Sequence, residues 1–335
     1  MTWSELDWPA LDRLRAGFLA GPSAGLSYWQ THADLASYDF TYGERIGWKW
    51  DAVLAELRLR GWRPTARTVL DWGCGSGIAG RRVLSFFGPE NFDALHLWDH
   101  SPLAVEFAAA AAQAAFPSLR VATADPSLNP QPSAPSSASD PIGLLIVSHV
   151  LNELSPTARA ELDALIARAE AVLWVEPGTH EVSRQLGAIR ETLRGEFTLV
   201  APCTHACACG VFTPEHTRDW CHFFAPPPSE IFATPDWVKF GQRAGIDLRS
   251  LPYAFLALDR RAPAPATDLS RIIGRPEHFK PYARFLNCDA TGLTELELLK
   301  RADPALYKQL DRTKAPLVYR WRRDGDKITG GEPLA

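Results

Sequence analysis

A glycine-rich stretch constrains the fold of this chain more than any other feature. Residues 69–80 read Val-Leu-Asp-Trp-Gly-Cys-Gly-Ser-Gly-Ile-Ala-Gly, a short apolar run that reaches Asp71 and then breaks into glycines. Glycines let backbone N–H groups approach a ligand closely and let a helix pack tightly on a strand. The stretch therefore predicts a first β-strand and a nucleotide-binding turn that contains Gly73, Gly75 and Gly77, followed by a helix.

The glycines alone do not choose between two cofactors. The window from Gly75 to Gly80 also fits G-x-G-x-x-G, the pattern of dinucleotide-binding proteins. Asp71 is placed to meet a cationic amine, and this acidic residue favours S-adenosylmethionine over NAD. We therefore expect S-adenosylmethionine as the cofactor.

From residue 67 onward, short apolar runs alternate with helical patterns, which is typical of a parallel sheet covered by helices. The second expected strand, 94–98, leads to Asp99, about 20 residues past the glycines, where a ribose hydroxyl pair is held. The alternative role for Asp99 is that of an acid at the entry of the next helix. The third strand, 121–125, ends in Asp125, a candidate partner for the adenine amino group. We therefore predict an α/β fold with cofactor residues at the strand ends.

Polar residues follow the fourth expected strand, at the sheet edge where ligands bind in open α/β folds. This strand ends at Ser148, which we expect in the cofactor pocket, and His149, Asn152 and Glu153 come next as catalytic candidates. His149 and Glu153 can act as general bases, as can Glu176 after the fifth strand, if they reach the substrate proton. The alternative is that these residues cap helices or order the cofactor loop.

Composition narrows the class of protein. The chain of 335 residues is long enough for two domains, and its 46% hydrophobic residues are ordinary for a globular core. No apolar run approaches the roughly 20 residues of a membrane helix. The first residues include acids and tryptophans where a secretory signal would be basic and then apolar. We therefore expect a cytoplasmic protein with no membrane partner.

The segment before the glycine turn, residues 1–66, is expected to form a helical cap, with helices near 9–20 and 48–60. Its aromatic side chains can pack in a core or stack on bases, and we favour packing because aromatics are mostly buried. These aromatics are Trp29, Tyr38, Phe40 and Tyr42. Residues 126–141, rich in Pro and Ser, are expected to be a surface loop inserted in the sheet domain.

Cysteines gather in one part of the chain. Of the six, Cys74 lies in the glycine turn, and four of the others fall within 202–210 and 220–222. In a cytoplasmic protein such crowding favours a metal over disulfides. A four-thiolate site can be built from any four of the five cysteines outside the turn, with a nearby histidine as a substitute. Sulfur ligands suit zinc or an iron–sulfur cluster, and the spacing does not separate the two.

Charge is distributed unevenly. Residues 1–259 hold 20 basic against 29 acidic side chains, whereas residues 260–327 hold 15 against 9. The second segment is the candidate face for an anionic partner, unless its arginines are solvated or paired with acids. Arginine and tryptophan alternate in 318–323, a pattern compatible with RNA contact or with an exposed edge strand. Thr294-Glu-Leu-Glu297 resembles a capping box and predicts a helix start.

Five motifs carry a family resemblance. They are Asp71-x-Gly-x-Gly-x-Gly, Ser148-His-Val-Leu-Asn-Glu-Leu154, Trp174-Val-Glu-Pro-Gly178, Pro202-Cys-Thr-His205 and Trp220-Cys-His-Phe223. Over about residues 40–325 the chain resembles the bacterial and mitochondrial small-ribosomal-subunit methyltransferase-like family. The resemblance implies a class I methyltransferase fold, a four-cysteine iron–sulfur site and a role in assembly of the ribosomal small subunit. It implies no DNA partner.

By position, the resemblance implies a [4Fe-4S] cluster on four cysteines and leaves Cys207 as a non-ligand. The implied ligands are Cys203, Cys209, Cys221 and Cys288. The domain organisation expected is a helical cap at 1–66, a methyltransferase-like domain at 67–258 with the cysteine cluster at 203–221, and a basic appendage at 259–335. The leading hypothesis is an S-adenosylmethionine-binding, iron–sulfur protein that engages small-subunit ribosomal RNA, with methyl transfer itself left open. Two alternatives remain: an ordinary methyltransferase of a small molecule or protein with a zinc site, and a non-catalytic RNA-binding assembly factor.

Overall fold

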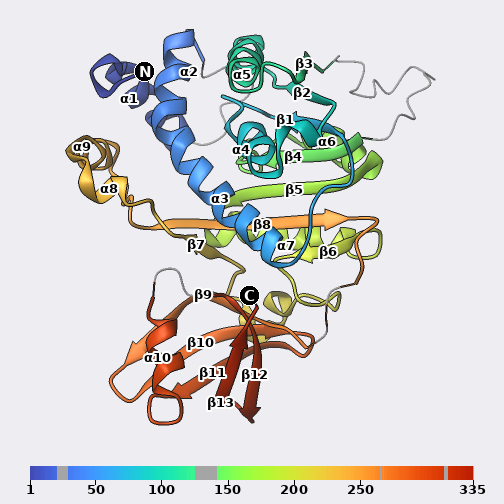
Figure 1. Ribbon diagram of the computed structural model, residues 1–335, viewed down its shortest axis with the longest axis vertical. Coiled ribbons are helices and arrows are strands. Elements are labelled where there is room, and N and C mark those ends of the chain that lie inside the picture. The colour runs from blue at the N-terminus through green and yellow to red at the C-terminus, as the bar shows by residue number, and fades with distance from the viewer. Residues whose placement is uncertain (21–28, 125–141, 265, 267, 313–315, 335) are drawn as a thin grey trace. The chain divides into compact units, whose positions relative to one another are not determined.

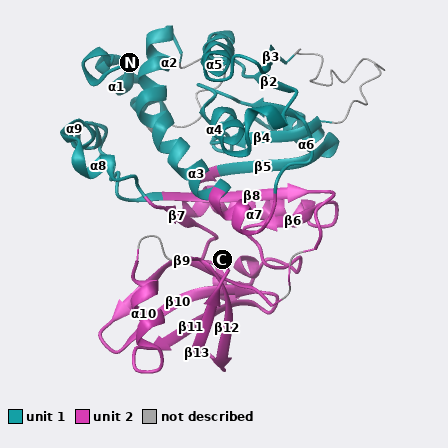
Figure 2. Cartoon of the chain, in the orientation of Figure 1, with its two compact units in different colours: residues 1–54, 63–175, 227–251 teal, residues 55–62, 176–226, 252–335 magenta. Residues whose placement is uncertain are grey.

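Figure 1 shows the fold of the chain as a computed structural model. It describes residues 1–20, 29–124, 142–264, 266, 268–312 and 316–334. The chain divides into two compact units (Figure 2). Unit 1 comprises residues 1–54, 63–175 and 227–251, and unit 2 comprises residues 55–62, 176–226 and 252–335. The three-part division expected from the sequence stays a prediction.

Unit 1 is built on a parallel sheet (Figure 1). Its strands are β1 (Thr68–Trp72), β2 (Ala94–Trp98), β3 (Arg120–Thr123), β4 (Ile142–Ser148) and β5 (Ala169–Pro177), of which β5 continues into unit 2. They lie in the order β3-β2-β1-β4-β5, and each neighbouring pair is parallel. The strand order reverses between β1 and β4, which places a ligand crevice at the carboxyl ends of these strands. The predicted α/β, class I methyltransferase-like fold is confirmed.

Helices of unit 1 begin where the sequence supplies caps. α4 (Ile78–Phe87) follows the glycine turn, α5 (Pro102–Ala115) follows β2, and α6 (Pro156–Arg168) follows β4. Ser101 and Ser155 cap α5 and α6: each hydroxyl accepts a backbone N–H, and a proline occupies the first helical position. α4 contacts β1 and β4, the strands on either side of the point where the strand order reverses, while α5 contacts β2 and β3.

The N-terminal part of unit 1 is helical, as predicted. It contains α1 (Trp8–Ala20), α2 (His32–Tyr38), a π-helical turn (Asp39–Gly43) and α3 (Glu44–Leu59), whose last turns belong to unit 2. Arg81 of α4 donates to Asp39 at 2.7 and 2.8 Å, which ties the π-helical turn to the helix after the glycines. Among the residues described, no helix is long and apolar enough to span a membrane.

The aromatic residues of this segment contact other aromatic residues of unit 1. Trp29 lies 5.0 Å from Tyr38 between ring centroids, Tyr38 lies 5.9 Å from Tyr42, and Phe40 lies 5.2 Å from Trp3. α8 (Glu230–Ala233) and α9 (Pro235–Ala244) complete the unit. The packing role favoured for these aromatics is therefore confirmed. The loop predicted at 126–141 lies outside the described residues.

Unit 2 contains the helix α7 (His180–Leu193), three strands that pair with one another and a five-stranded barrel. α7 is followed by β6 (Thr198–Ala201) and β7 (Phe223–Ala225), both of which pair with β8 (Leu251–Asp259). The barrel strands are β9 (Ser270–Phe279), β10 (Tyr282–Asp289), β11 (Gly292–Leu299), β12 (Val318–Asp324) and β13 (Lys327–Pro333), with α10 (Pro304–Leu310) between β11 and β12. They close in the order β10-β11-β13-β12-β9. The basic appendage is thus a folded barrel.

The barrel core explains one wrong prediction. Thr294–Glu297 do not begin a helix; they lie in β11 and pair antiparallel with β10. Leu296 and Leu298 are fully buried in the barrel core, while Glu295 and Glu297 alternate with them on the other face. The two-residue alternation of apolar and acidic side chains therefore outweighs the local capping pattern. The helix begins instead after Asp303, whose carboxylate accepts the Leu306 N–H at 2.9 Å.

Candidate functional site

Three segments of unit 1 meet at the carboxyl ends of β1, β2 and β4. The Cys74 N–H donates to the Trp98 carbonyl at 3.0 Å, which joins the glycine turn to the end of β2. A Cβ atom at Gly73 would lie 2.8 Å from Val150, so the same turn touches the segment after β4. The structure therefore brings the predicted cofactor turn together with the predicted catalytic segment.

The glycine turn is open at one position and closed at another. Gly77 has φ of +77° at the start of α4, and a Cβ there would lie 2.8 Å from the Ala108 Cβ, so a larger residue would clash. Gly75 has φ of +51°, and a Cβ there would meet no atom of the described residues within 4 Å. The backbone at Gly75 thus faces open space, as the approach of a ligand requires.

Asp71 is fully buried beneath this turn. Its Oδ2 accepts the Gly80 N–H at 3.0 Å, which holds the first turn of α4, and its Oδ1 is buried with no hydrogen-bond partner among the described residues. Burial raises the pKa of Asp71 to about 7, although the Gly80 N–H and Arg81 favour the ionised form. The carboxyl group therefore positions the turn through its hydrogen bond with the Gly80 N–H.

Asp99 joins the turn to the end of β2. Its Oδ2 accepts the Gly75 N–H at 2.9 Å and its Oδ1 accepts the Ser101 N–H at 2.9 Å. The side chain is only 6% exposed. The His100 Nδ1 lies 3.3 Å from the same Oδ1, whereas Oδ2 accepts the Gly75 N–H and can accept a further hydrogen bond, so the group can order the loop and still receive a hydroxyl. The two roles weighed for Asp99 are thus compatible.

Side chains of α3 reach the end of β4, which sequence reasoning missed. The Trp50 indole N–H donates to the Ser148 Oγ at 3.0 Å, and the buried Lys49 Nζ lies 3.1 Å from the His149 Nε2. His149 Nδ1 lies 3.3 Å from the Ser148 Oγ. Lys49 and Trp50 sit in an expected helix, and the signal available was a lysine between two tryptophans in Trp48-Lys-Trp50.

His149 is held in an unusual backbone conformation. Its φ is +57°, in the left-handed region that non-glycine residues rarely adopt and that is often found at functional sites. Burial lowers the pKa of His149 well below its usual value, and the neighbouring Lys49 and Arg45 lower it further. The imidazole is therefore neutral at pH 7, with Nε2 as the acceptor from the lysine ammonium.

The remaining candidates lie in different surroundings. Asn152 and Glu153 are exposed on the turn after β4. Burial raises the pKa of the Tyr38 phenol, and the nearby Glu153 raises it further. Glu176 is fully buried in unit 2. Asp125 lies outside the described residues. Asn152 and Glu153 are thus the predicted catalytic residues that face solvent.

In unit 2, four cysteines share one neighbourhood. Burial raises the pKa of Cys221 well above its usual value, and Cys203, Cys209 and Cys288 add to the effect because their thiols are close. Burial raises the pKa of Cys288 in the same way, and the nearby Cys203 and Cys209 raise it further. Cys207, by contrast, is exposed. The group that comes together is the set implied by the family resemblance.

The thiols are not arranged as ligands of one metal ion. Among the residues that the structure describes, no group of three or more His, Cys, Asp or Glu side chains has the arrangement of a metal site. The His205 Nε2 lies 3.4 Å from the Cys288 Sγ, and His205 is buried. The metal-site prediction therefore has support from the proximity of the thiols but none from their geometry.

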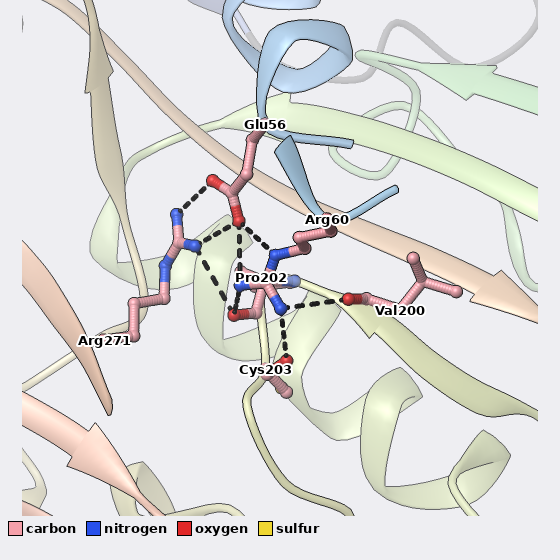
Figure 3. Close-up of polar contacts among 6 residues, drawn as sticks. All are labelled: Glu56, Arg60, Val200, Pro202, Cys203 and Arg271. Atoms are coloured by element: carbon pink, nitrogen blue, oxygen red, sulfur yellow. Dashed lines mark hydrogen bonds and ion pairs between the residues drawn. The ribbon is translucent and has the colours of Figure 1, made fainter. Parts of the chain in front are cut away.

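A buried carboxylate with two arginines holds the chain at the first of these cysteines (Figure 3). Glu56 in α3 pairs with Arg271 of β9, at 2.8 Å between Oε2 and Nη2, and with the Arg60 Nε at 2.9 Å. Arg60 also donates to three backbone carbonyls of the segment that leads into Cys203. They are the carbonyls of Val200, Pro202 and Cys203, at 3.1, 2.8 and 3.1 Å. This network positions the cysteine segment through its backbone.

A third arginine, Arg190, contacts the backbone of the same segment at His205. Arg190 of α7 is fully buried, donates to the His205 carbonyl at 3.0 Å and lies beside the Cys203 thiol. Burial lowers its pKa, but the neighbouring Cys203 and Glu191 outweigh burial and raise it overall. Glu191 pairs with Arg190 and also accepts the Cys209 N–H at 3.1 Å. Arg190 therefore places a positive charge beside Cys203, with Glu191 as its counter-charge.

Comparison with known proteins gave one family and distant structural likenesses. Residues 51–312 match the family described as "Mitochondrial small ribosomal subunit Rsm22". A search of curated proteins found no match. Among solved structures, a Thermoplasma acidophilum protein is 13% identical, with a TM-score of 0.37 over 70% of this chain and 100% of that chain.

Two further structures, both in complex with S-adenosyl-homocysteine, are similarly distant. The plantazolicin methyltransferase BpumL in complex with SAH is 12% identical, with a TM-score of 0.39 over 77% of this chain and 98% of its own. TrmK of M. capricolum, in complex with S-adenosyl-homocysteine, is 5% identical, with a TM-score of 0.33 over 62% and 68%. These likenesses are too remote to carry an argument, and the fold is assigned from the strand order.

The buried Asp71 predicts a distinctive pH dependence. Its folded-state pKa, about 7, lies above that of an unfolded aspartate, so the folded protein binds the extra proton between about pH 4 and 7 and loses stability as pH rises through this window. Asp71→Asn keeps an acceptor for Gly80 and does not titrate. Relative to wild type, the variant should gain on the order of 3 kcal/mol in unfolding free energy from pH 4.5 to 8, measured by urea denaturation.

The matched control is Asp163→Asn, on an α6 side chain that is 52% exposed. Its stability relative to wild type should hardly change with pH. Parallel pH profiles for wild type and Asp71→Asn would show that Asp71 is ionised in the fold.

The Glu56 network predicts a large cost for losing one charge. Glu56→Gln would leave two buried guanidiniums without a counter-charge and should lower the unfolding free energy by about 3 to 5 kcal/mol. Glu332→Gln, in a pair exposed by 70% and 64%, should cost less than about 1 kcal/mol. Hydrogen exchange of the amides at 200–209 should accelerate in the first variant only.

The pH dependence of this effect has a definite sign. Burial raises the pKa of Glu56, but Arg271 and Arg60 outweigh burial and lower it overall. Its stabilisation is therefore present above the unfolded pKa of about 4.3 and is lost as pH falls toward the folded value. Equal losses for Glu56→Gln and Glu332→Gln at pH 7 would refute the network's importance.

Proposed function

Because the chain belongs to the family described as mitochondrial small ribosomal subunit Rsm22, we propose that it is a methyltransferase-like protein that binds S-adenosylmethionine and acts on the ribosomal small subunit and its RNA. The observation that carries the proposal is the extent of the match. Residues 51–312 span the glycine turn, the segment after β4 and every cysteine from Cys203 to Cys288. The matched stretch therefore includes residues of both units.

The residues at the ends of β1 and β2 fit S-adenosylmethionine in chemistry. Asp99 is nearly buried and its Oδ2 keeps acceptor capacity for a ribose hydroxyl, and the backbone at Gly75 faces open space. Bound there, the cofactor would supply an electrophilic methyl group on a sulfonium. The chain's own part is to hold the cofactor and the acceptor in line, which can supply much of the rate enhancement of methyl transfer.

The segment after β4 would provide the acceptor side. His149 is neutral and its Nε2 is engaged by Lys49, so we assign it a positioning role for the turn. Asn152 and Glu153 are exposed on this turn and can orient an acceptor or take its proton. Whether methyl transfer occurs depends on an acceptor that reaches these two residues.

The four clustered cysteines support an iron–sulfur site, with zinc as the alternative. Thiolates suit both, and a [4Fe-4S] cluster takes four of them. Cys203, Cys209, Cys221 and Cys288 fit in number and kind, and Arg190 supplies positive charge beside Cys203. Because Cys288 belongs to β10, such a site would join the barrel to the cysteine segment within unit 2. The cluster's contribution would then be to folding.

The proposal of a ribosomal partner rests on the family's description, and the same description bears on where in the cell the protein acts. That description names the mitochondrial small subunit, so the cytoplasmic location expected from the sequence stays a prediction. Co-sedimentation of the full chain with small-subunit particles from cells tests the partner. Recovery only in the particle-free fractions, at low and physiological salt, would contradict the proposal.

Cofactor binding is tested by Asp99→Asn. The substitution removes the charge that would hold the ribose, while the shape of the side chain is kept. Affinity for S-adenosylmethionine, measured by calorimetry, should fall about 10- to 100-fold, because hydrogen bonds to charged groups contribute about 1.5 to 3 kcal/mol. Asp93→Asn, on an aspartate that is 60% exposed, is the matched control and should bind as wild type does. Unchanged affinity for Asp99→Asn would remove the pocket assignment.

The cysteine site is tested by metal analysis after anaerobic purification. Wild type and Cys207→Ser should contain iron and acid-labile sulfide, because Cys207 is exposed and outside the group of four. Cys221→Ser should lose most of both and should melt at a lower temperature, since ligand loss removes binding energy that contributes to folding. Colourless, zinc-loaded wild type would contradict the iron–sulfur cluster and favour zinc.

A further inference from the structure

The barrel of unit 2 has the topology of an oligonucleotide/oligosaccharide-binding fold. Three antiparallel strands, β9 to β11, are followed by α10 and then by the hairpin β12–β13. β13 pairs parallel with β11, and β12 pairs antiparallel with β9, which closes the barrel. Such five-stranded barrels bind oligonucleotides through the second and third strands and the adjacent loops. Here these elements are β10, β11 and the tip of the β9–β10 hairpin.

From this barrel we infer a binding surface for single-stranded RNA at one end. We define the aromatic–basic end as Phe279, Lys280, Tyr282, Lys300, Arg301 and Lys308. The inference rests on the proposed function, because it names the surface and the form of RNA that the protein would engage. Three observations on these side chains carry it: an exposed aromatic stack, close contact among their segments, and lysine and arginine charges without acidic partners.

The aromatic stack lies at the tip of the β9–β10 hairpin. Phe279 and Tyr282 flank the two-residue turn and face one another in register, with ring centroids 4.7 Å apart and planes at 23°. Phe279 is 39% exposed, which is unusual for a phenylalanine. Unpaired bases stack on such rings, whereas duplex bases are already stacked on one another. The ring pair therefore favours single strands.

The cationic residues come from segments that meet at this hairpin. The Tyr307 hydroxyl of α10 donates to the Phe279 carbonyl at 2.7 Å, and the Lys300 N–H donates to the Pro281 carbonyl at 2.9 Å. The Lys300 Nζ lies 5.2 Å from the Tyr307 ring centroid. The turn before α10 and α10 itself thus lie beside the aromatic stack, and they bring Arg301 and Lys308 to the same end.

Charge separates this end from the rest of the barrel. Lys280, Lys300, Arg301 and Lys308 are all exposed, and none forms an ion pair with a residue that the structure describes. The arginines of β12, which the sequence had suggested for RNA contact, are paired instead. Their partners are Asp268 for Arg320, Glu332 for Arg322 and Asp289 for Arg323. Phosphates would meet uncompensated charge at the aromatic–basic end and neutralised charge on β12.

The test uses the full chain and fluorescence anisotropy. The probes are a labelled oligouridylate of about twelve nucleotides, within the usual site size of these barrels, and an RNA duplex of the same length. Wild type should prefer the single strand. Phe279→Ala combined with Tyr282→Ala should weaken single-strand binding about tenfold or more, because stacking is lost. Phe279→Trp, which keeps a ring face, should restore most of the affinity when Tyr282 is intact.

Two further variants separate charge from stacking. Lys280→Gln with Lys300→Gln should reduce the salt slope of binding by roughly 0.7 for each cation that contacts a phosphate. The matched controls are Phe232→Ala, an aromatic that is 65% exposed in unit 1, and Arg322→Gln, an ion-paired arginine of β12. Both controls should bind as wild type does.

The outcomes distinguish this surface from the function on which it rests. Wild-type affinity in the Phe279/Tyr282 double variant, or a wild-type preference for duplex over single strand, would overturn the inference. Full loss in Arg322→Gln would overturn it as well, because binding would then run along β12. If wild type binds the oligouridylate through Phe279 and Tyr282 but does not co-sediment with small-subunit particles, the surface stands and the ribosomal proposal fails.

Discussion

Unit 2 depends on one buried carboxylate. Glu56 stands between two guanidiniums, one from the barrel strand β9 and one from its own helix α3, and the second of these, Arg60, holds the backbone at Cys203. Burying charges costs several kcal/mol per ion unless geometry and further hydrogen bonds compensate. Here the second arginine and the carbonyls of the cysteine segment supply those bonds. The network therefore links the barrel, the helix and the cysteine-bearing segment, and each loses a partner if the carboxylate is lost.

Unit 1 uses buried carboxylates in a different way. Asp71 pairs with no cationic side chain among the described residues and holds α4 through a backbone N–H, so burial shifts it toward the protonated form. Asp99 accepts two backbone N–H groups at the edge of the crevice and keeps the capacity for more. Asp71 thus holds the start of α4, while Asp99 joins the glycine turn to the end of β2. At the end of β4, His149 has a positive φ and its Nε2 lies 3.1 Å from the Lys49 Nζ.

Net charge alone would have misplaced the RNA surface. The basic excess of the C-terminal segment is real, but pairing decides which charges a phosphate can meet. On β12 each arginine pairs with a carboxylate, whereas Lys300 and Lys308 pair with none in the part of the chain that the structure describes. On β10, Cys288 lies near His205 at one end, while Tyr282 lies at the hairpin tip. The two ends of a single strand thus carry residues of the two candidate sites, cysteine and RNA.

The sequence by itself determined the α/β class, because strand periodicity, glycine spacing and serine–proline caps are local signals that tertiary contacts reinforce. It also drew attention to Asp99, whose role in cofactor binding stays a prediction, and to the cysteines that lie close together in unit 2. Only the tertiary structure decided their surroundings: Lys49 meets His149 across 100 positions and Glu56 meets Arg271 across 215. It also turned the capping pattern at 294–297 into a strand, since burial of Leu296 and Leu298 outweighs a local hydrogen-bond preference. Partners this distant leave no periodic trace in a sequence, because their contact depends on how the strands and helices are assembled.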